Sequence, residues 1–227
     1  MSNHLFSLKG DIMSEKQTLN EVYADTLKKM ENLTEKQKRV LQASLELFAS
    51  QGFEATTSQQ IAKRAGVSVG SVYHTFPTKQ AILVAVRAPI FEGTMDTVAN
   101  QFNDNTFGKG FESVEELVKV TIADRFYFAD KNINVIRLML GQMLVNSVFV
   151  EDLKKFFEQQ AKQLVLPTIV RLQAEQKIKN LPIEKILQIL FYPLATYIGK
   201  RVLGINNMSL EEEIEFATEI TIKTLKV

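Results

Sequence analysis

The stretch that decides the fold is residues 57–79, TSQQIAKRAGVSVGSVYHTFPTK. Thr57 and Gln60 have the spacing of a capping box, so we expect a helix to begin there and to end at Gly66. Ser68 is the expected cap of a second short helix. The segment therefore predicts two short helices separated by a glycine turn.

The same stretch supplies what a helix-turn-helix requires. Two short helices that cross steeply need a small residue at their contact, a turn residue that tolerates positive φ, and a shared apolar core. Ala62 is the small residue and Gly66 is the turn. The shared core is expected to consist of the remaining apolar side chains, Ile61, Ala65, Val67 and Val72.

Helical periodicity continues on both sides of this segment. No run of alternating apolar and polar residues ends in Asn-Gly or Asp-Gly, so hairpins are not expected. The predicted fold is therefore all-α. Capping boxes and apolar stripes predict these further helices: Leu19–Met30, a helix from the Thr34 cap to Gly52, Lys79–Phe102, a helix from the Ser113 cap to Phe128, Ile133–Val145 with Asn132 as its cap, Val148–Lys177 with a kink at Pro167, Ile183–Leu203 with a kink at Pro193, and Leu210–Leu225.

Composition excludes several classes of function. The chain has no cysteine, which excludes disulfides, thiolate metal sites and cysteine nucleophiles. The two histidines, His4 and His74, lie far apart, so we predict no metal site and no cofactor. Catalysis needs a convergent set of titratable groups, and the glutamate run at 211–213 is better explained by a helix start, which favours negative charge. We therefore predict that the protein is not an enzyme.

Two features predict a cytoplasmic location. The charges of Lys9, Asp11, Glu15 and Lys16 interrupt the hydrophobicity that a secretory signal needs. No later stretch approaches about 18 charge-free apolar residues, the length of a membrane helix. We expect no membrane partner.

Positive charge is concentrated in the helix-turn-helix region. The whole chain has a formal net charge of +1. Residues 33–79 hold six basic and three acidic residues, hence +3, whereas residues 1–32 and 80–227 each come to −1. Such an asymmetry is typical of a DNA-binding part on an otherwise neutral protein.

Residues 34–83 resemble the DNA-binding region of the TetR family of bacterial regulators. The resemblance rests on these positions: Phe48 followed by Gly52-Phe53, Thr56-Thr57, Ile61-Ala62, Ala65-Gly66-Val67-Ser68, and Tyr73, Phe76 and Lys79. It implies a three-helix helix-turn-helix DNA-binding domain at 33–79 and a six-helix domain at 80–227 for ligand sensing and dimerisation. Residues 1–32 are an extension that the family does not require, and we expect it to be helical or disordered.

The expected DNA contacts fall into two kinds. Hydroxyls and a cation donate to phosphate, which sets the register of the protein on DNA. By resemblance, Gln59, Val69, Gly70 and His74 meet base edges, and a glutamine can pair with adenine. The full set of expected contacts is Thr57, Ser58, Gln59, Ser68, Val69, Gly70, Ser71, Tyr73, His74 and Lys79. The alternative that Thr57, Ser68 and Thr78 only cap helices, and that His74 is an exposed spectator, stays open.

Aromatic and methionine residues are frequent in the C-terminal half. They form either an ordinary helical core or, with the internal prolines and the adaptable methionines, a pocket for a largely apolar effector. Arg137 or Arg171 would meet an anionic end of that effector. The candidate effector-binding residues are Phe126, Arg137, Met139, Met143, Phe156, Arg171, Phe191 and Tyr197.

The resemblance also implies a homodimer formed through the last two helices. A two-fold dimer places its two heads in successive major grooves, roughly 34 Å apart, and reads a palindrome. The expected function is a repressor that a small effector releases from double-stranded operator DNA. The alternative is an architectural or division-control DNA-binding protein of the same fold that answers to a protein partner.

Overall fold

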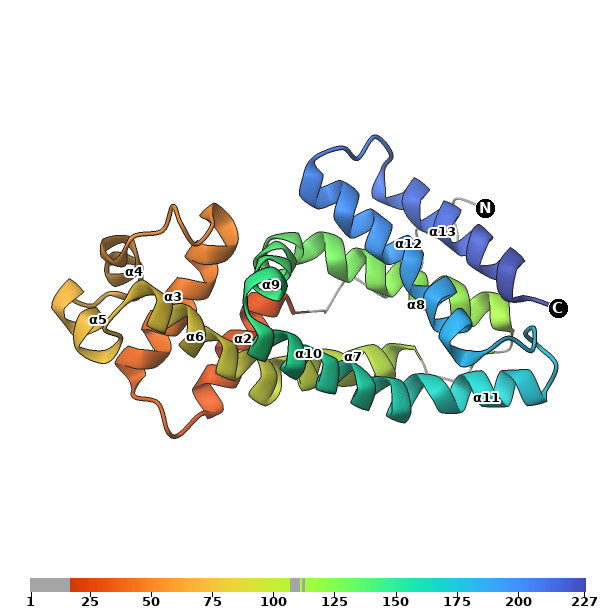
Figure 1. Cartoon of the computed structure of the whole chain (residues 1–227), viewed down its shortest axis with the longest axis horizontal. Helices are drawn as coiled ribbons and strands as arrows, with labels where there is room; N and C mark the ends of the chain where they lie inside the picture. Colours follow the sequence, from red (N-terminus) through yellow and green to blue (C-terminus); the bar gives the residue numbers. More distant parts are fainter. Residues whose placement is uncertain (1–16, 107–110, 112) are drawn as a thin grey trace. The chain divides into compact units, whose positions relative to one another are not determined.

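The computed structural model describes residues 17–106, 111 and 113–227. These residues form helices and one isolated β-bridge, between Ile178 and Lys226, so the predicted all-α class is confirmed. They group into two compact units (Figure 1). The head unit comprises residues 17–98 and 134–156, and the C-terminal unit comprises residues 99–133 and 157–227. The predicted domain limits at residues 32 and 79 stay predictions.

The head unit is built around the three helices of the helix-turn-helix region. Its most deeply buried side chains come from several helices and include Tyr23, Leu41, Phe48, Ile61, Val72 and Ile82. The helices that contribute to this unit are α2 (Leu19–Lys29), α3 (Glu35–Gln51), α4 (Ser58–Ala65), α5 (Val69–Thr75), α6 (Lys79–Pro89), the π-helical turn η1 (Ile90–Thr94), the start of α7 (Met95–Asn105), α9 (Ile133–Val145) and most of α10 (Ser147–Gln160).

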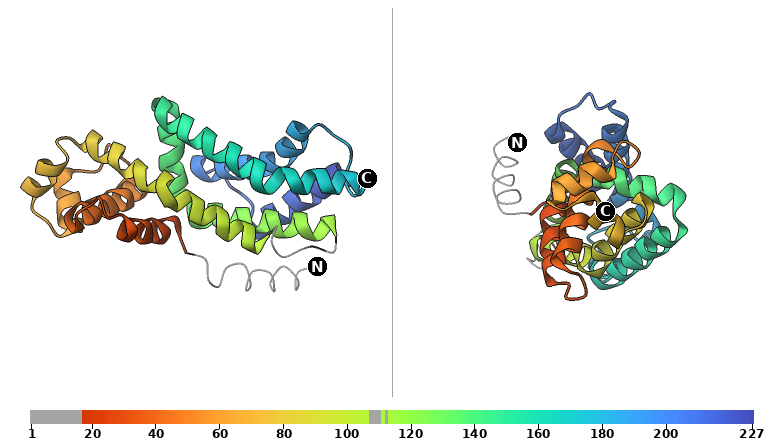
Figure 2. Two further views of the ribbon diagram at one scale, coloured as in Figure 1. Left: turned by 90° about the horizontal axis from the view of Figure 1, so that it is seen from below. Right: turned by 90° about the vertical axis from the view of Figure 1, so that its left-hand side faces the viewer.

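Helix α2 lies within the predicted extension at residues 1–32, where the sequence analysis expects a helix at Leu19–Met30. A capping box between Thr18 and Glu21 starts the helix. Its apolar face is buried, with Tyr23 fully enclosed, and α2 contacts α3, which lies beside it in Figure 2. Residues 1–16 lie outside the described part of the chain.

Two predicted long helices are interrupted in the structure. The prediction of one helix over Lys79–Phe102 is wrong, because η1 separates α6 from α7. Pro89 lacks the N–H that a continuous helix needs, and Gly93 departs from helical geometry with φ 167° and ψ −31°. The predicted helix at 148–177 consists of α10, a π-helical turn η3 (Ala161–Val165) and α11 (Leu166–Ala174), with Pro167 in the first turn of α11. Its end at Ala174 corrects the predicted end at Lys177.

The C-terminal unit packs its last two helices against α8. Helix α8 (Val114–Lys131) contacts both α12 (Ile183–Leu203) and α13 (Leu210–Leu225), which also contact one another and are the two blue helices of Figure 1. Both last helices have the predicted bounds. Asn132 ends α8, where its N–H and its side-chain amide donate to the Phe128 carbonyl. Phe126 stacks on Tyr197 in the core of this unit, with 4.9 Å between ring centroids.

Membrane-span criteria give a mixed result for the described residues. No single helix among them is long and apolar enough to cross a bilayer. The bent pair Ile133–Val145 and Ser147–Ala174 meets the criteria of length and composition only when its two helices are taken together.

Candidate nucleic-acid interface

Helices α4 and α5 are held by side-chain caps at both of their N-termini. Thr57 accepts from the Gln60 N–H and Gln60 reaches back to the Thr57 N–H, which completes the predicted capping box. Ser68 accepts from the Ser71 N–H at 3.1 Å and so caps α5. Each cap satisfies backbone donors that a helix start leaves without partners. The two helices are therefore fixed at the ends that the sequence predicts.

Gly66 forms the turn between the two helices. It adopts the left-handed conformation with φ 64° and ψ 42°, and its N–H donates to carbonyls of the last turn of α4. The neighbouring Val67 N–H donates to the Ala62 carbonyl at 3.0 Å. Only glycine adopts this backbone conformation routinely. The predicted helix-turn-helix core is buried at Ile61, Ala62, Ala65 and Val72, whereas Val67 is half-buried.

The residues expected to meet base edges are mostly open to solvent. Gln59 in the first turn of α4 and Gly70 and His74 on α5 are exposed, and Val69 is half-buried. Tyr73 is 49% exposed on the same helix. These side chains come from two helices that contact one another. They offer an amide, an imidazole, a phenol and a bare stretch of backbone to a ligand outside the protein.

The smaller hydroxyl residues already have partners within the protein. Thr57 and Ser68 are helix caps, and Ser68 Oγ lies 2.9 Å from Ser71 Oγ. Thr78 caps α6 by accepting from the Ala81 N–H at 3.0 Å. Ser58 is buried. The capping role left open for Thr57, Ser68 and Thr78 is thus seen, and their contact with phosphate stays a prediction.

Lys79 has a structural role that the sequence did not predict. Its Nζ donates to the carbonyls of Phe53 at 2.7 Å and Glu54 at 3.2 Å, and it lies 4.3 Å from the centre of the Phe53 ring. The lysine therefore ties the start of α6 to the loop between α3 and α4. An ammonium has three N–H donors, so one remains for a phosphate oxygen. The sequence offers only a weak signal for this contact, which is a cation at the last position of the motif and an aromatic residue, Phe53, earlier in the same region.

Exposed cations lie on α3 and α4. Arg64 pairs with Glu46 through two nitrogens, Nε at 2.8 Å and Nη2 at 2.6 Å. Lys36, Arg39 and Lys63 are exposed, and none has an ion-pair partner among the described residues. Unpaired surface cations attract a polyanion without first breaking an ion pair.

The eight residues predicted to bind an effector do not gather in one place. Arg137, Met139, Met143 and Phe156 belong to the head unit, whereas Phe126, Arg171, Phe191 and Tyr197 belong to the C-terminal unit. Phe126 and Tyr197 are core residues that stack on one another. The side chains of Arg137, Met143, Arg171 and Phe191 are exposed. Both arginines lie on exposed helix faces, and their contact with an anionic effector stays a prediction.

Two recesses lie among the described residues, one in the head unit and one in the C-terminal unit. The recess of the head unit occupies about 360 Å³ with its open part included, and Met139 is the one predicted residue that lines it. The recess of the C-terminal unit occupies about 450 Å³ on the same basis. Its lining is apolar apart from Thr121 and Thr168, and it comes from α8, α11, α12, Val165, Ile178 and Leu225. Helical periodicity predicted none of these positions as ligand contacts.

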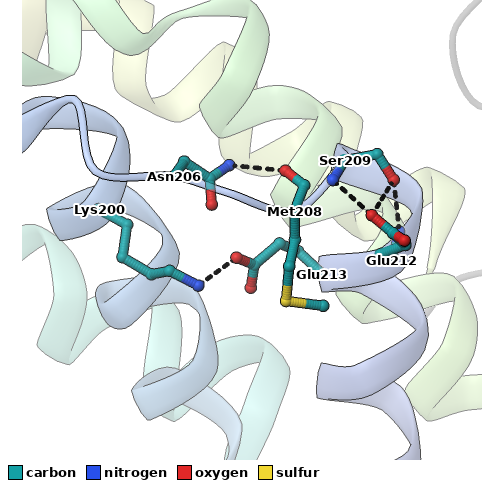
Figure 3. Close-up of polar contacts among 6 residues, drawn as sticks. All are labelled: Lys200, Asn206, Met208, Ser209, Glu212 and Glu213. Carbon is teal, nitrogen blue, oxygen red and sulfur yellow. Dashed lines mark hydrogen bonds and ion pairs between the residues drawn. The ribbon is translucent and has the colours of Figure 1, made fainter.

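The last two helices expose apolar side chains and are joined by a well-fixed turn. Figure 3 shows Lys200 of α12 paired with the buried carboxylate of Glu213 on α13. The capping box between Ser209 and Glu212 starts α13, and the Asn206 amide donates to the Met208 carbonyl at 3.2 Å. The large exposed apolar side chains of these helices are Phe191, Tyr192, Leu203, Phe216 and Ile220.

Comparison with known proteins finds a family match within the head unit and several similar proteins. The family described as "Bacterial regulatory proteins, tetR family" matches residues 40–86. The transcriptional regulator YerO of Bacillus subtilis is 29% identical over 126 residues, which are 55% of this chain and 41% of YerO. The nucleoid occlusion factor SlmA of Glaesserella parasuis is 30% identical over 130 residues, 56% of this chain and 61% of SlmA. The transcriptional repressor KstR of Rhodococcus jostii is 43% identical over 58 residues, 26% of this chain and 27% of KstR. The chain thus spans less than two thirds of the length of each of these relatives.

A solved structure extends the similarity of fold beyond the head. A TetR-family transcriptional regulator from Mesorhizobium loti superposes with a TM-score of 0.64 over 85% of this chain and 97% of its own. The two sequences are 17% identical, so this likeness concerns the fold alone.

Proposed function

Because this chain belongs to the TetR family of bacterial regulatory proteins, we propose that it is a DNA-binding transcriptional regulator that reads its operator with α4 and α5. The observation that supports the proposal is the exposed set Gln59, Gly70, Tyr73 and His74 on two capped helices joined by the left-handed Gly66. A rigid pair of helices presents these groups to DNA without an ordering step. The proposal assigns no catalytic step to the chain and a cytoplasmic location to the protein.

Direct readout is assigned to few residues. In this proposal Gln59 pairs with adenine, Val69 touches a thymine methyl, and Gly70 lets the backbone come close to a base. The hydroxyl of Tyr73 and the remaining donor of Lys79 bind phosphates, which positions the head without specifying sequence. Thr57, Ser58, Ser68, Ser71 and His74 complete the proposed contact surface. So few polar base contacts leave room for readout of DNA shape.

The experiment is a salt-dependent DNA-binding assay on the best operator found in a genome-wide binding survey. Tyr73→Phe removes one uncharged phosphate donor and nothing else, so binding should weaken on all sequences alike while the salt slope stays the same, because no cation is lost. Equal affinity of wild type and Tyr73→Phe for the operator would remove Tyr73 from the interface.

We propose a homodimer formed through α12 and α13. Support comes from the exposed apolar side chains on these helices and from the Lys200–Glu213 pair, which holds the two helices together as one surface. The two heads of such a dimer would be related by a two-fold axis and would therefore read a palindromic operator. Sedimentation at micromolar concentration tests this, and a monomer would contradict it.

We propose repression, relieved by a small, largely apolar effector. The repressor KstR shares 43% of 58 residues with this chain, which supports the mode of action. The recess of the C-terminal unit supports the apolar class of effector, because its lining offers two hydroxyls and no charge. Much of its 450 Å³ is open to solvent and the enclosed part is small, which implies a slender ligand or a recess that widens on binding. Calorimetry with compounds that displace the protein from its operator is the test, and displacement without binding to the protein would contradict it.

A second candidate is an architectural or division-control protein on the same fold. The similarity to SlmA, a nucleoid occlusion factor, supports it over 56% of this chain. Dispersed binding sites in the genome-wide survey would favour this candidate. A single site beside its own or a neighbouring gene would favour the regulator.

A further inference from the structure

Helix α2 has no role in the proposed function, yet its apolar face is buried in the head unit. Its inward side chains Leu19, Val22, Tyr23 and Leu27 are each at most 4% exposed. The helix contacts α3, but it also contacts α6 and η1. Helix α2 therefore also contacts the segment around the break between α6 and α7.

The break leaves the long helix without its regular hydrogen bonds. In an uninterrupted α-helix the N–H of Ile90 would donate to the carbonyl of Val86. Here the Ile90 N–H donates to the Arg87 carbonyl instead, and Pro89 has no N–H to give. Gly93 then leaves helical geometry altogether. The chain enters α7 from this point and leaves the head unit after Val98. A bend at the break would change the direction of α6, and with it the helix-turn-helix, relative to α7.

Helix α2 supplies polar partners on both sides of the break. The Tyr23 hydroxyl donates to the Val86 carbonyl at 3.2 Å, in buried surroundings. Thr94 Oγ1 lies 2.8 Å from the Pro89 carbonyl oxygen and 3.2 Å from Thr26 Oγ1. Tyr23 and Thr26 are three residues apart and thus share one face of α2. This face of α2 therefore contacts α6 through Tyr23 and η1 through Thr26.

Close packing accompanies these hydrogen bonds. A Cβ atom at Gly93 would lie 3.1 Å from Thr26 Cγ2, closer than side chains normally approach. Thr26 is itself buried, so it has little room to move aside. The missing side chain at Gly93 is what allows α2 to lie against η1.

We propose that α2 is a brace that fixes the angle between α6 and α7, and that this brace strengthens operator binding. The second part rests on the proposed function. A head held in one orientation loses less conformational freedom on binding DNA than a head that moves about a hinge. Loosening the brace should therefore lower operator affinity without changing the phosphate contacts.

The test uses a substitution and its repair. Gly93→Ala inserts a methyl group that would lie 3.1 Å from Thr26 Cγ2, so α2 must shift to accept it. Adding Thr26→Ser removes the Cγ2 atom in its path and keeps the hydroxyl. Thr26→Ser alone shows the effect of the lost methyl. Gly141→Ala is the matched control, because Gly141 lies in α9 of the same unit with no atom within 4 Å of a Cβ.

Two quantities are measured on the full chain. The first is amide hydrogen exchange of residues 86–95 without DNA, which reports opening of the break. We expect exchange to be about tenfold faster in Gly93→Ala, the effect of an overpacked contact, and close to wild type in the repaired double variant and in Gly141→Ala. The second is the operator dissociation constant, expected to rise by up to about tenfold in Gly93→Ala alone, with an unchanged salt slope.

Three results would overturn the proposal. Wild-type exchange in Gly93→Ala would mean that α2 does not hold the break. Fast exchange that Thr26→Ser fails to repair would mean that the contact with Thr26 is not responsible. Unchanged operator affinity despite fast, repairable exchange would remove the effect on DNA binding. Hydrogen exchange is measured without DNA, so it tests the brace independently of the proposed function. A wild-type protein that binds no operator would refute the proposed function alone.

Discussion

Replacing Lys79 by methionine separates its two roles. Methionine keeps an unbranched stem on Phe53 and has a similar helix propensity, but it loses the charge and both hydrogen bonds. The bond to the Phe53 carbonyl, at 2.7 Å and partly buried, accounts for about 2 kcal/mol, and the longer, exposed bond to Glu54 for about 1 kcal/mol. Loss of the cation over the Phe53 ring costs about 0.5 kcal/mol more.

A smaller effect acts in the opposite direction. Lys79 is the first residue of α6, and removing a positive charge from a helix N-terminus stabilises the helix by about 0.5 kcal/mol. The freed carbonyls are also reachable by water, which lowers the loss. The free energy of unfolding should therefore fall by about 2 kcal/mol, measured by urea denaturation without DNA.

DNA binding by the same variant reports the other role. If Lys79 also binds a phosphate, the slope of log affinity against log salt becomes shallower by about 0.9. Lys63→Met is the control for stability, since Lys63 is exposed on α4 and should cost at most about 0.5 kcal/mol. Unchanged stability in Lys79→Met would refute the anchoring role, and an unchanged slope would refute the phosphate contact.

Three further predictions concern other parts of the chain. Gly66→Ala forces a side chain into the left-handed turn and should lower the free energy of unfolding by about 1 kcal/mol. Gly70→Ala, whose Cβ would meet only Ser68 Oγ at 4.0 Å, should leave the free energy of unfolding unchanged or higher and yet weaken operator binding. Urea denaturation and a shift assay compare the two variants, and an equal loss of stability in both would contradict this. Hydrogen bonds from Ser209 hold the pKa of Glu212 below its ordinary value of 4.5, so the contribution of Glu212 to stability is present above pH 4.5 and is lost as the pH falls through the lowered pKa. The free energy of unfolding should therefore fall more in wild type than in Glu212→Gln on acidification from pH 6 to pH 3. Parallel plots of the free energy of unfolding against pH would refute the link. Phe216→Glu places a charge on the exposed apolar face of α13 and should dissociate the dimer in sedimentation, and an intact dimer would move the interface elsewhere.

The helix-turn-helix could be predicted because its signals are local. Thr57 with Gln60, Ser68, and Gly66 each act on backbone groups within a few residues of themselves, and the structure places all of them as the sequence predicts. The bounds of α12 and α13 follow from equally local signals at Pro182 and Ser209.

The break in the long helix after Lys79 could not be predicted in the same way. Pro89 marks a weak point, but a proline within a helical pattern does not say where the chain bends. The structure also places Thr26, 67 residues earlier in the chain, in the space that a side chain at Gly93 would need. Lys79 illustrates the same limit, since its carbonyl partners lie 25 and 26 residues away.

The residues around a pocket are hard to predict from the sequence. Residue type and helical spacing do not tell which helix faces meet. Phe126 and Tyr197 belong to the core, and the recess of the C-terminal unit is lined instead by aliphatic residues such as Leu117 and Ile169, which are indistinguishable in sequence from ordinary core positions.

The most direct test of the central claim is selection of DNA from a random duplex pool by the purified full chain at physiological salt. Sequence-specific reading by α4 and α5 of a dimer predicts enrichment of an inverted repeat, with half-site centres about one helical turn apart or a multiple of it. Gln59→Ala should relax the preference at one position of each half-site. A pool that shows no enrichment, or the same enrichment for Gln59→Ala, would contradict the claim that these helices read DNA.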